Sequence, residues 1–143
     1  MKVLAVDYGL KRVGLASGLF ETKIAFPKGV IFRKEDDENV IKELLRICRD
    51  EGYDKVVFGM PYNMDGTKSK MHEIIQAFVA KFKGALLKEG LSISVDVVDE
   101  RLSSFEADAY VGDLPDAKRA DLREKNGERD MMAAKVILER YFG

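Results

Sequence analysis

Short apolar runs and helical repeats alternate along the chain in an order that predicts a mixed α/β fold. Residues 3–6 form a β-prone run that ends at Asp7-Tyr8-Gly9, and residues 12–17 form a second run closed by Gly18, which together predict a hairpin. Residues 29–33 predict a third strand. We expect these first three strands to be antiparallel.

The spacing of apolar residues becomes helical from residue 36 onward. The helix expected there ends before Gly52, and its apolar positions are Val40, Ile41, Leu44, Leu45 and Cys48. A second helix is expected at residues 69–88, with an apolar side made of Ile74, Ile75, Phe78, Val79, Phe82 and Leu86. A closing helix at about 128–141 should turn Met132, Ala133, Val136, Ile137 and Phe142 toward the core.

Two further strands and a variable region complete the prediction. Residues 55–59 and 92–98 are compact apolar runs, and the first of them is typical of a strand buried on both faces. A short helix is expected at 105–111, capped by Ser103 or Ser104, and a mobile basic loop at 113–127. The order predicts one domain, residues 1–143, with a mixed five-stranded sheet and helices packed on it. In such sheets the ligand crevice usually lies beyond the carboxyl ends of the strands.

Composition and charge narrow the class of protein. The chain has 24 basic and 25 acidic residues, so its overall charge does not indicate a nucleic-acid binder, and only the distribution of charge could. The single cysteine excludes a disulfide framework and indicates a reducing, cytoplasmic compartment. The first residues suit a strand better than a signal peptide, and no stretch is long enough to span a membrane.

Acidic residues stand at the ends of apolar elements. Asp7 closes the first strand, Asp99 and Glu100 close the last, and Asp130 opens the final helix. Each has an ordinary alternative: Asp7 could shape a turn, Asp130 could favour the helix dipole, and Asp99-Glu100 could pair with neighbouring arginines. The predicted topology nevertheless brings all of them toward one rim of the sheet. Clustered carboxylates repel one another unless a cation lies between them, and Mg²⁺ or Mn²⁺ suits such oxygen ligands.

Such a cluster would serve phosphodiester hydrolysis, in which two metal ions about 4 Å apart activate water and stabilise the leaving oxygen. The only histidine, His72, is expected to be exposed on the long helix, so a histidine-based mechanism is poorly supplied. The loop after residue 59 could present backbone N–H groups of Gly66 and Thr67 to an anion, or be an ordinary connection. Lys11 and Arg12 could likewise anchor phosphates or merely flank a turn.

Four segments taken together resemble the YqgF/RuvX family. They are residues 6–16 (VDYGLKRVGLA), 57–67 with its VFGMP and NMDGT pieces, 99–104 (DERLSS) and 130–134 (DMMAA), and the resemblance covers essentially the whole chain. The family has the ribonuclease H-like fold of the Holliday-junction resolvases. Its proposed activity is the processing of pre-16S ribosomal RNA, with junction resolution as the other proposed activity.

The resemblance implies roles for individual residues. Asp7, Glu100 and Asp130 would be catalytic, and the same three together with Asp99 would be metal ligands, Glu100 being favoured over Asp99. Nucleic acid would contact Lys11, Arg12, Asn63, Thr67, Lys68, Arg101, Ser103, Lys118 and Arg119. One departure concerns the central strand, which ends in Gly59-Met60 where related resolvases carry an acid, so the third ligand must come from Asp99 or Glu100.

The sequence therefore predicts a metal-dependent nuclease that acts on structured nucleic acid, either pre-16S ribosomal RNA in its 5′ maturation or branched DNA. Cutting a junction on two strands would suit a two-fold homodimer. Two other classes stay open. The missing central-strand acid would also fit a non-catalytic nucleic-acid-binding module, and the Asp-x-Gly hairpin would fit an ATP-binding protein of the actin and sugar-kinase superfamily, although 143 residues leave little room for its second domain.

Overall fold

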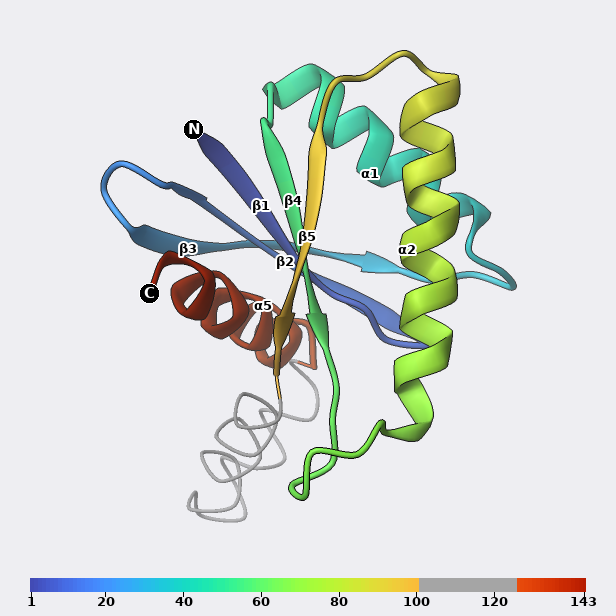
Figure 1. The fold of residues 1–143 in the computed structure, drawn as a ribbon. Helices are drawn as coiled ribbons and strands as arrows, with labels where there is room; N and C mark the ends of the chain where they lie inside the picture. The colour runs from blue at the N-terminus through green and yellow to red at the C-terminus, as the bar shows by residue number, and fades with distance from the viewer. Residues whose placement is uncertain (101–125) are drawn as a thin grey trace.

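The computed structural model describes residues 1–100 and 126–143, which form a five-stranded mixed sheet with helices on both faces (Figure 1). The strands are β1 (Lys2–Asp7), β2 (Arg12–Leu19), β3 (Ile24–Phe32), β4 (Lys55–Met60) and β5 (Ser94–Asp99), in the order β3-β2-β1-β4-β5. The first three are antiparallel, and β4 and β5 run parallel to β1. The predicted mixed sheet is confirmed.

Three helices cover the sheet in the described part of the chain: α1 (Glu38–Glu51), α2 (Lys70–Lys88) and α5 (Asn126–Phe142). Figure 1 shows α1 and α2 on one face and α5 on the other. Helix α1 ends at Gly52, which adopts the left-handed conformation (φ 67°) that glycine tolerates without a steric penalty. The apolar spacing in the sequence thus placed each helix to within about two residues, the usual uncertainty at helix ends.

Strand β3 begins at Ile24, earlier than the predicted start at residue 29. The strand thus includes Pro27, although proline normally interrupts a strand because it has no N–H to donate. Here β3 is the edge of the sheet, where proline is tolerated, and a bulge between Leu15 and Ala16 shifts the register by pairing them with Gly29 and Pro27.

The core between the sheet and helices α1 and α2 is built around aromatic rings. The ring of Phe58 lies 5.9 Å from that of Phe78 and 5.7 Å from that of Phe82, both edge-on, in the geometry that aromatic pairs prefer. Ile74, predicted on the apolar side of α2, is instead exposed, because the buried stripe runs through Ile75, Phe78, Val79, Phe82 and Leu86.

The other core lies between the sheet and α5 and is made largely of small side chains. Ala5, Ala16, Ala25 and Ala134 are buried there, which lets the helix backbone come close to the strands. The predicted inward face of α5 was partly wrong: Ile137 and Phe142 are buried, but Met132 is exposed and Leu138 is buried. The buried stripe of α5 differs from the predicted one because the helix packs on the strands through the side that carries Ala134.

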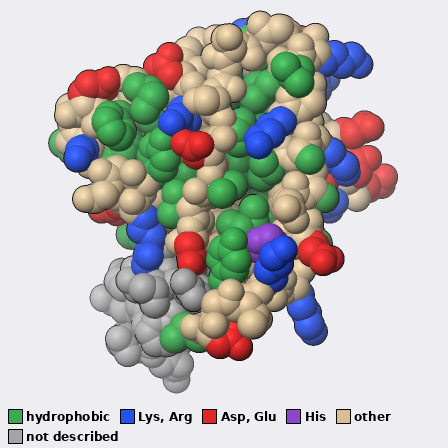
Figure 2. All heavy atoms as spheres, in the orientation of Figure 1, with side chains coloured by type: hydrophobic (Ala, Val, Ile, Leu, Met, Phe, Trp, Pro, Cys, Tyr) green, Lys and Arg blue, Asp and Glu red, His purple; other side chains and the backbone are tan. Residues whose placement is uncertain are grey.

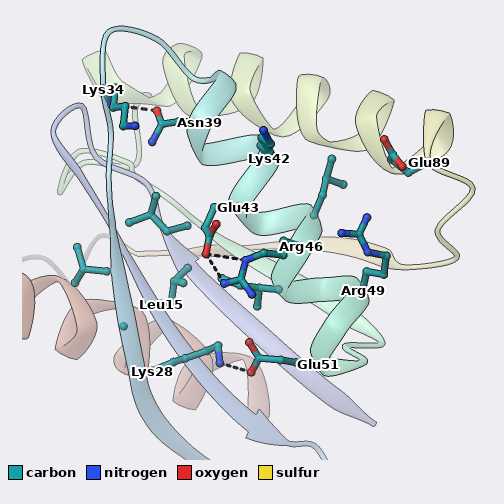
Figure 3. Close-up of a pocket in the computed structure, with 15 residues that line it drawn as sticks. Leu15, Lys28, Lys34, Asn39, Lys42, Glu43, Arg46, Arg49, Glu51 and Glu89 are labelled. Atoms are coloured by element: carbon teal, nitrogen blue, oxygen red, sulfur yellow. Dashed lines mark hydrogen bonds and ion pairs between the residues drawn. The ribbon is translucent and has the colours of Figure 1, made fainter.

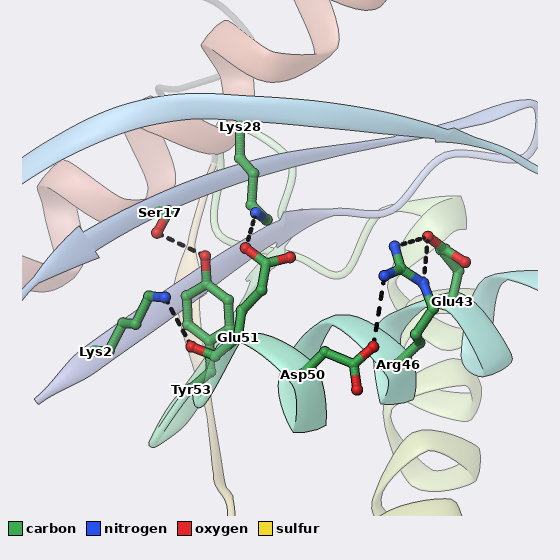
Figure 4. A network of polar contacts seen from close by, with 8 residues as sticks. All are labelled: Lys2, Ser17, Lys28, Glu43, Arg46, Asp50, Glu51 and Tyr53. Carbon is green, nitrogen blue, oxygen red and sulfur yellow. Dashed lines mark hydrogen bonds and ion pairs between the residues drawn. The ribbon is translucent and has the colours of Figure 1, made fainter.

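Polar contacts tie the carboxyl end of α1 and the following Tyr53 to strands β1, β2 and β3 (Figure 4). The hydroxyl of Tyr53 donates to Ser17 Oγ at 2.6 Å, and Lys2 Nζ donates to the Glu51 carbonyl oxygen at 2.8 Å. Lys28, the bulged residue of β3, forms an ion pair with the Glu51 carboxylate. The end of the sheet opposite the acidic residues is therefore closed by structural contacts.

Within residues 1–100 and 126–143, no helix is long and apolar enough to cross a membrane. The helix expected at 105–111, most of the loop expected at 113–127, and the candidate residues Arg101, Ser103, Lys118 and Arg119 lie outside the described residues.

The aromatic core makes a direct prediction of stability. Phe82 is fully buried, so Phe82→Ala should leave a cavity and lower the free energy of unfolding by about 3–5 kcal/mol. Leu87 on the same helix is 82% exposed, and Leu87→Ala should change it by less than about 0.5 kcal/mol. Urea unfolding curves of the two variants measure both values, and equal losses would contradict the assigned orientation of α2.

Candidate active site

Asp7 lies at the carboxyl end of β1 between two glycines. Side chains alternate along a strand, so Asp7 faces the same side as Val3 and Ala5, which is the side covered by α5. On β2 its register partner is Gly14. On β4 the residue beside it is Gly59, which follows the pair formed by Val6 and Phe58. Asp7 is therefore flanked on both sides by positions without a side chain.

The space above the two glycines is occupied by other parts of the site. A Cβ atom added to Gly14 would lie 2.1 Å from the backbone oxygen of Asp130. A Cβ atom added to Gly59 would lie 2.5 Å from Glu100 Oε2 and 2.4 Å from Ile137 Cδ1. Because real Cβ contacts are never this short, the glycines allow α5 and Glu100 to approach the end of β1.

Glu100 supplies a carboxyl group over the central strand. It follows β5, where its N–H donates to the Met60 carbonyl oxygen at 3.1 Å and continues the ladder by one residue. Its side chain is buried and hydrogen-bonded to Asp7. The carboxyl group of Glu100 thus lies over Gly59 at the end of the central strand, whose own residues at positions 59 and 60 carry no acid.

The pKa values of both carboxyl groups are raised by desolvation and by nearby negative charge. Burial, followed by the negative charge of Asp130, raises the pKa of Asp7 to about 7. Burial, followed by the charge of Asp7, raises the pKa of Glu100 to about 9. The two carboxyl groups are hydrogen-bonded to each other, which requires that they share a proton in the absence of a cation.

Asp130, the third predicted ligand, stands on α5 with its backbone against Gly14. Its charge acts on Asp7, yet its carboxylate accepts a hydrogen bond from Arg12 Nε at 2.8 Å. Arg12 was predicted to contact nucleic acid and here forms an ion pair inside the site. The structure brings Asp7 and Glu100 into contact. The carboxylate of Asp130 lies close by but forms its ion pair with Arg12.

The donor set suits a hard divalent cation, although the side chains are not gathered around one point. Across residues 1–100 and 126–143, no three Asp, Glu, His or Cys side chains are grouped closely enough to hold a metal ion. Asp7 and Glu100 nevertheless offer adjacent carboxyl oxygens, which Mg²⁺ and Mn²⁺ prefer, and a cation would replace the shared proton. Asp99 is the weaker candidate, since strand alternation turns it away from the face of Val98 and Glu100.

The loop between β4 and α2 does not form the anion cradle that its glycine suggested. The N–H of Gly66 donates to the Asn63 carbonyl oxygen at 2.9 Å, and the N–H of Thr67 donates to Asp65 Oδ1 at 3.0 Å. Asn63 Nδ2 donates to Thr67 Oγ1 at 3.0 Å, so these two predicted contact residues stabilise the loop itself. Lys68 is exposed on the same loop.

His72 is buried rather than exposed, and its ring packs edge-on against Tyr62 at 5.0 Å. The prediction that His72 is exposed was wrong, because its polar neighbours occupy the outer face of α2 while His72 itself turns inward. Its Nδ1 atom has no hydrogen-bond partner in the described part of the chain. His72 therefore lies with the α2 side of the sheet, away from the face that carries Asp7 and Glu100.

Sequence reasoning missed the residues that support Asp7. The Tyr8 hydroxyl donates to Asp37, and Arg33 Nε donates to the same carboxylate at 2.9 Å. The ring of Tyr8 packs on Phe78 with centroids 4.5 Å apart. Together these contacts fix the backbone next to Asp7 against α1 and α2. The glycines at positions 14 and 59 were a visible signal, because glycine inside a strand often marks close approach of another group.

The described surface away from this site carries mixed charge and an apolar-lined groove. Figure 2 shows basic and acidic side chains interspersed over the displayed face, without one large basic patch. A groove of about 760 Å³ opens between β3 and α1 (Figure 3). It is lined by apolar residues such as Leu15 and Ile31 and by ion pairs such as Glu43 with Arg46, and it contains none of the predicted site residues.

Comparison with known proteins identifies the family of the chain. The model of a family described as "RuvX: Holliday junction resolvase" matches residues 1–143. The chain belongs to this family. A relative from Maridesulfovibrio salexigens, named "Putative pre-16S rRNA nuclease", is 36% identical over 99% of this chain and 97% of its own length. One of the same name from Endomicrobium trichonymphae is 31% identical over 98% of this chain and 94% of its own.

Solved structures share the fold of this RuvX-family chain. Thermus thermophilus RuvC in complex with a Holliday junction substrate aligns with a TM-score of 0.56 and 13% identity, over 99% of this chain and 93% of that one. The Fowlpox virus resolvase in complex with Holliday junction DNA aligns with a TM-score of 0.54 and 17% identity, over 99% and 97%. The sheet and its helices therefore have the ribonuclease H-like fold of the resolvases.

The glycine at position 14 can be tested without touching a carboxylate. Gly14→Ala should push α5 and Asp130 away from the end of β1, costing about 1–3 kcal/mol of stability and most of any catalytic activity. Gly29→Ala, in the same hairpin, meets no atom within 4 Å and should change stability by less than about 0.5 kcal/mol. Thermal unfolding and activity assays of both variants check this, and a harmless Gly14→Ala would contradict the close contact.

The raised pKa values predict how stability depends on pH in the absence of divalent cations. Between pH 4 and about 9 the folded protein keeps protons on Asp7 and Glu100 that the unfolded chain releases, so stability should fall as pH rises through this range. Glu100→Gln cannot lose a proton, and its stability should fall less. Urea unfolding at several pH values in EDTA measures the difference, and parallel profiles would contradict the shared proton.

Proposed function

We propose that this protein is a metal-dependent nuclease that hydrolyses phosphodiester bonds of structured nucleic acid, with the 5′ end of pre-16S ribosomal RNA as its substrate. The relatives at 31% and 36% identity are named "Putative pre-16S rRNA nuclease", and both align over almost their whole length. A protein that acts on pre-ribosomal RNA would be cytoplasmic, and we propose that residues 1–143 act as a single domain.

The observation that carries the proposal is the contact between Asp7 and Glu100 at the carboxyl end of β1. A buried carboxyl group in contact with a second, partly buried one is costly, and such pairs with raised pKa values cluster at sites that bind cations or do acid–base chemistry. Asp7, Glu100 and Asp130 would hold Mg²⁺ or Mn²⁺, with Asp99 as an outer candidate. The bound cations would activate water and stabilise the leaving oxygen.

The chain's own residues have separate roles in this proposal. Asp7 and Glu100 would bind and orient the divalent cation. The glycines at positions 14 and 59 leave the space above the sheet free for these carboxyl groups. Lys11 and Lys68 are exposed near the carboxyl ends of the strands and would contact phosphates, so binding would weaken as salt increases. Arg101, Ser103, Lys118 and Arg119 are proposed for the same role from sequence.

Resolution of Holliday junctions is the second candidate. It is favoured by the family description and by the fold shared with resolvases solved on junction DNA. This activity cuts two strands and would need two copies of the chain related by a two-fold axis. A non-catalytic module is less well supported, because the acid missing from position 59 is compensated by Glu100 in the space above it.

A cleavage panel tests the proposal and separates the two substrates. Wild-type protein with Mg²⁺ or Mn²⁺ should cleave a pre-16S ribosomal RNA 5′ segment, and Asp7→Asn should reduce the rate at least about 100-fold because a metal ligand is lost. Asp50→Asn makes the same chemical change on the exposed surface of α1 and should keep full activity.

Each outcome of the panel has one meaning. Cleavage of a four-way junction but not of the ribosomal precursor would move the assignment to junction resolution. Salt-sensitive binding of both substrates, with no product from wild type in either metal, would favour the binding module. Equal rates for wild type and Asp7→Asn would place the chemistry outside this carboxylate pair.

A further inference from the structure

Arg12 forms an ion pair with Asp130, and Asp130 would have to leave this partner in order to join Asp7 and Glu100. Its Nε atom lies 2.8 Å from Asp130 Oδ2, and the pair joins β2 to α5 across the face that carries Asp7. Arg12 and Gly14 are two residues apart on β2 and therefore face the same side of the sheet. The guanidinium group thus stands next to the place where the backbone of Asp130 rests.

The third carboxylate of the site, Asp130, is near enough to act electrostatically on Asp7 but is paired with Arg12. Asp7 and Glu100 are hydrogen-bonded to one another, whereas the carboxylate of Asp130 is bound to Arg12. This arrangement explains why the described residues contain no group of three ligands around one point. The backbone of Asp130 is held against Gly14, so its side chain could change partner by rotating about its own bonds while α5 stays in place.

We propose that Arg12 is a positioning residue that holds Asp130 away from Asp7 and Glu100 until a divalent cation binds, and then contacts a phosphate of the nucleic acid. This inference rests on the proposed function, because it assumes that Asp7 and Glu100 bind a cation. In the metal-free protein the guanidinium neutralises Asp130. When Asp130 joins the other two carboxylates, Arg12 loses its partner and gains an unpaired positive charge at the site, where the substrate backbone passes.

This exchange links metal binding to substrate binding in one direction that can be measured. Arg12 competes with the cation for Asp130 and also repels it, so removing the guanidinium should tighten cation binding. The same removal should weaken nucleic-acid binding only when the cation is present, because only then is Arg12 free. A purely structural arginine would have the opposite or no effect on metal affinity.

The test compares Arg12→Gln with Lys11→Gln, its exposed neighbour on the β1–β2 turn, in the full-length protein. Calorimetric titration with Mn²⁺ should show Arg12→Gln binding about three- to tenfold tighter than wild type, while Lys11→Gln stays within about twofold. Arg12→Lys keeps the charge and should also stay near wild type. The side chains of Arg12 and Asp130 are 30% and 22% exposed, so these variants should fold.

A second measurement uses a nucleic acid that is not turned over. With Ca²⁺ in place of Mg²⁺, Arg12→Gln should bind a labelled four-way junction or ribosomal precursor several-fold more weakly than wild type, and in EDTA equally well. Lys11→Gln should weaken binding to the same extent in Ca²⁺ and in EDTA.

Unchanged or weaker Mn²⁺ binding by Arg12→Gln would overturn the inference and leave the proposed function standing, provided that wild type binds Mn²⁺ and Asp7→Asn does not. Equal weakening of nucleic-acid binding by Arg12→Gln in Ca²⁺ and EDTA would also overturn it. Absence of Mn²⁺ binding by wild type would remove the metal from the proposed function and this role of Arg12 with it.

Discussion

The arrangement of the site depends on the absence of side chains on either side of Asp7. Gly14 and Gly59 leave a shallow depression on the face of the sheet covered by α5, and Glu100 and the backbone of Asp130 fill it. Any larger residue at either position would collide with these groups. Close packing in protein interiors leaves no other room for them, so the lack of a side chain at positions 14 and 59 determines which carboxyl groups can meet.

The two faces of the sheet have different tasks. The α1 and α2 face carries the large aromatic core and fixes Tyr8, whose hydroxyl donates to Asp37, so the backbone beside Asp7 is rigid. The α5 face carries a thin layer of alanine and valine, which brings the helix and its acidic residue close to the strands. The larger hydrophobic core lies on one face and the candidate site on the other, and β1 contributes residues to both.

Membership in the RuvX family and the ribonuclease H-like fold fit this division. The carboxyl group over β4 comes from Glu100, one strand away, because the parallel pairing of β4 and β5 continues to the Glu100 N–H. Position in space, rather than position in the chain, decides which residue can act as a ligand.

The sequence alone determined the order and type of the elements and the ends at which Asp7, Glu100 and Asp130 stand, because periodicity, capping and turn residues act over a few neighbours. It could not determine that β3 continues through Pro27, that His72 is buried, or that Met132 is exposed, since these depend on which strand is an edge and how each helix is rotated. The ion pair of Arg12 with Asp130 joins residues 118 positions apart. Only the packing of α5 on the sheet could bring them together, because contacts at that separation are set by register and helix placement, which no local pattern encodes.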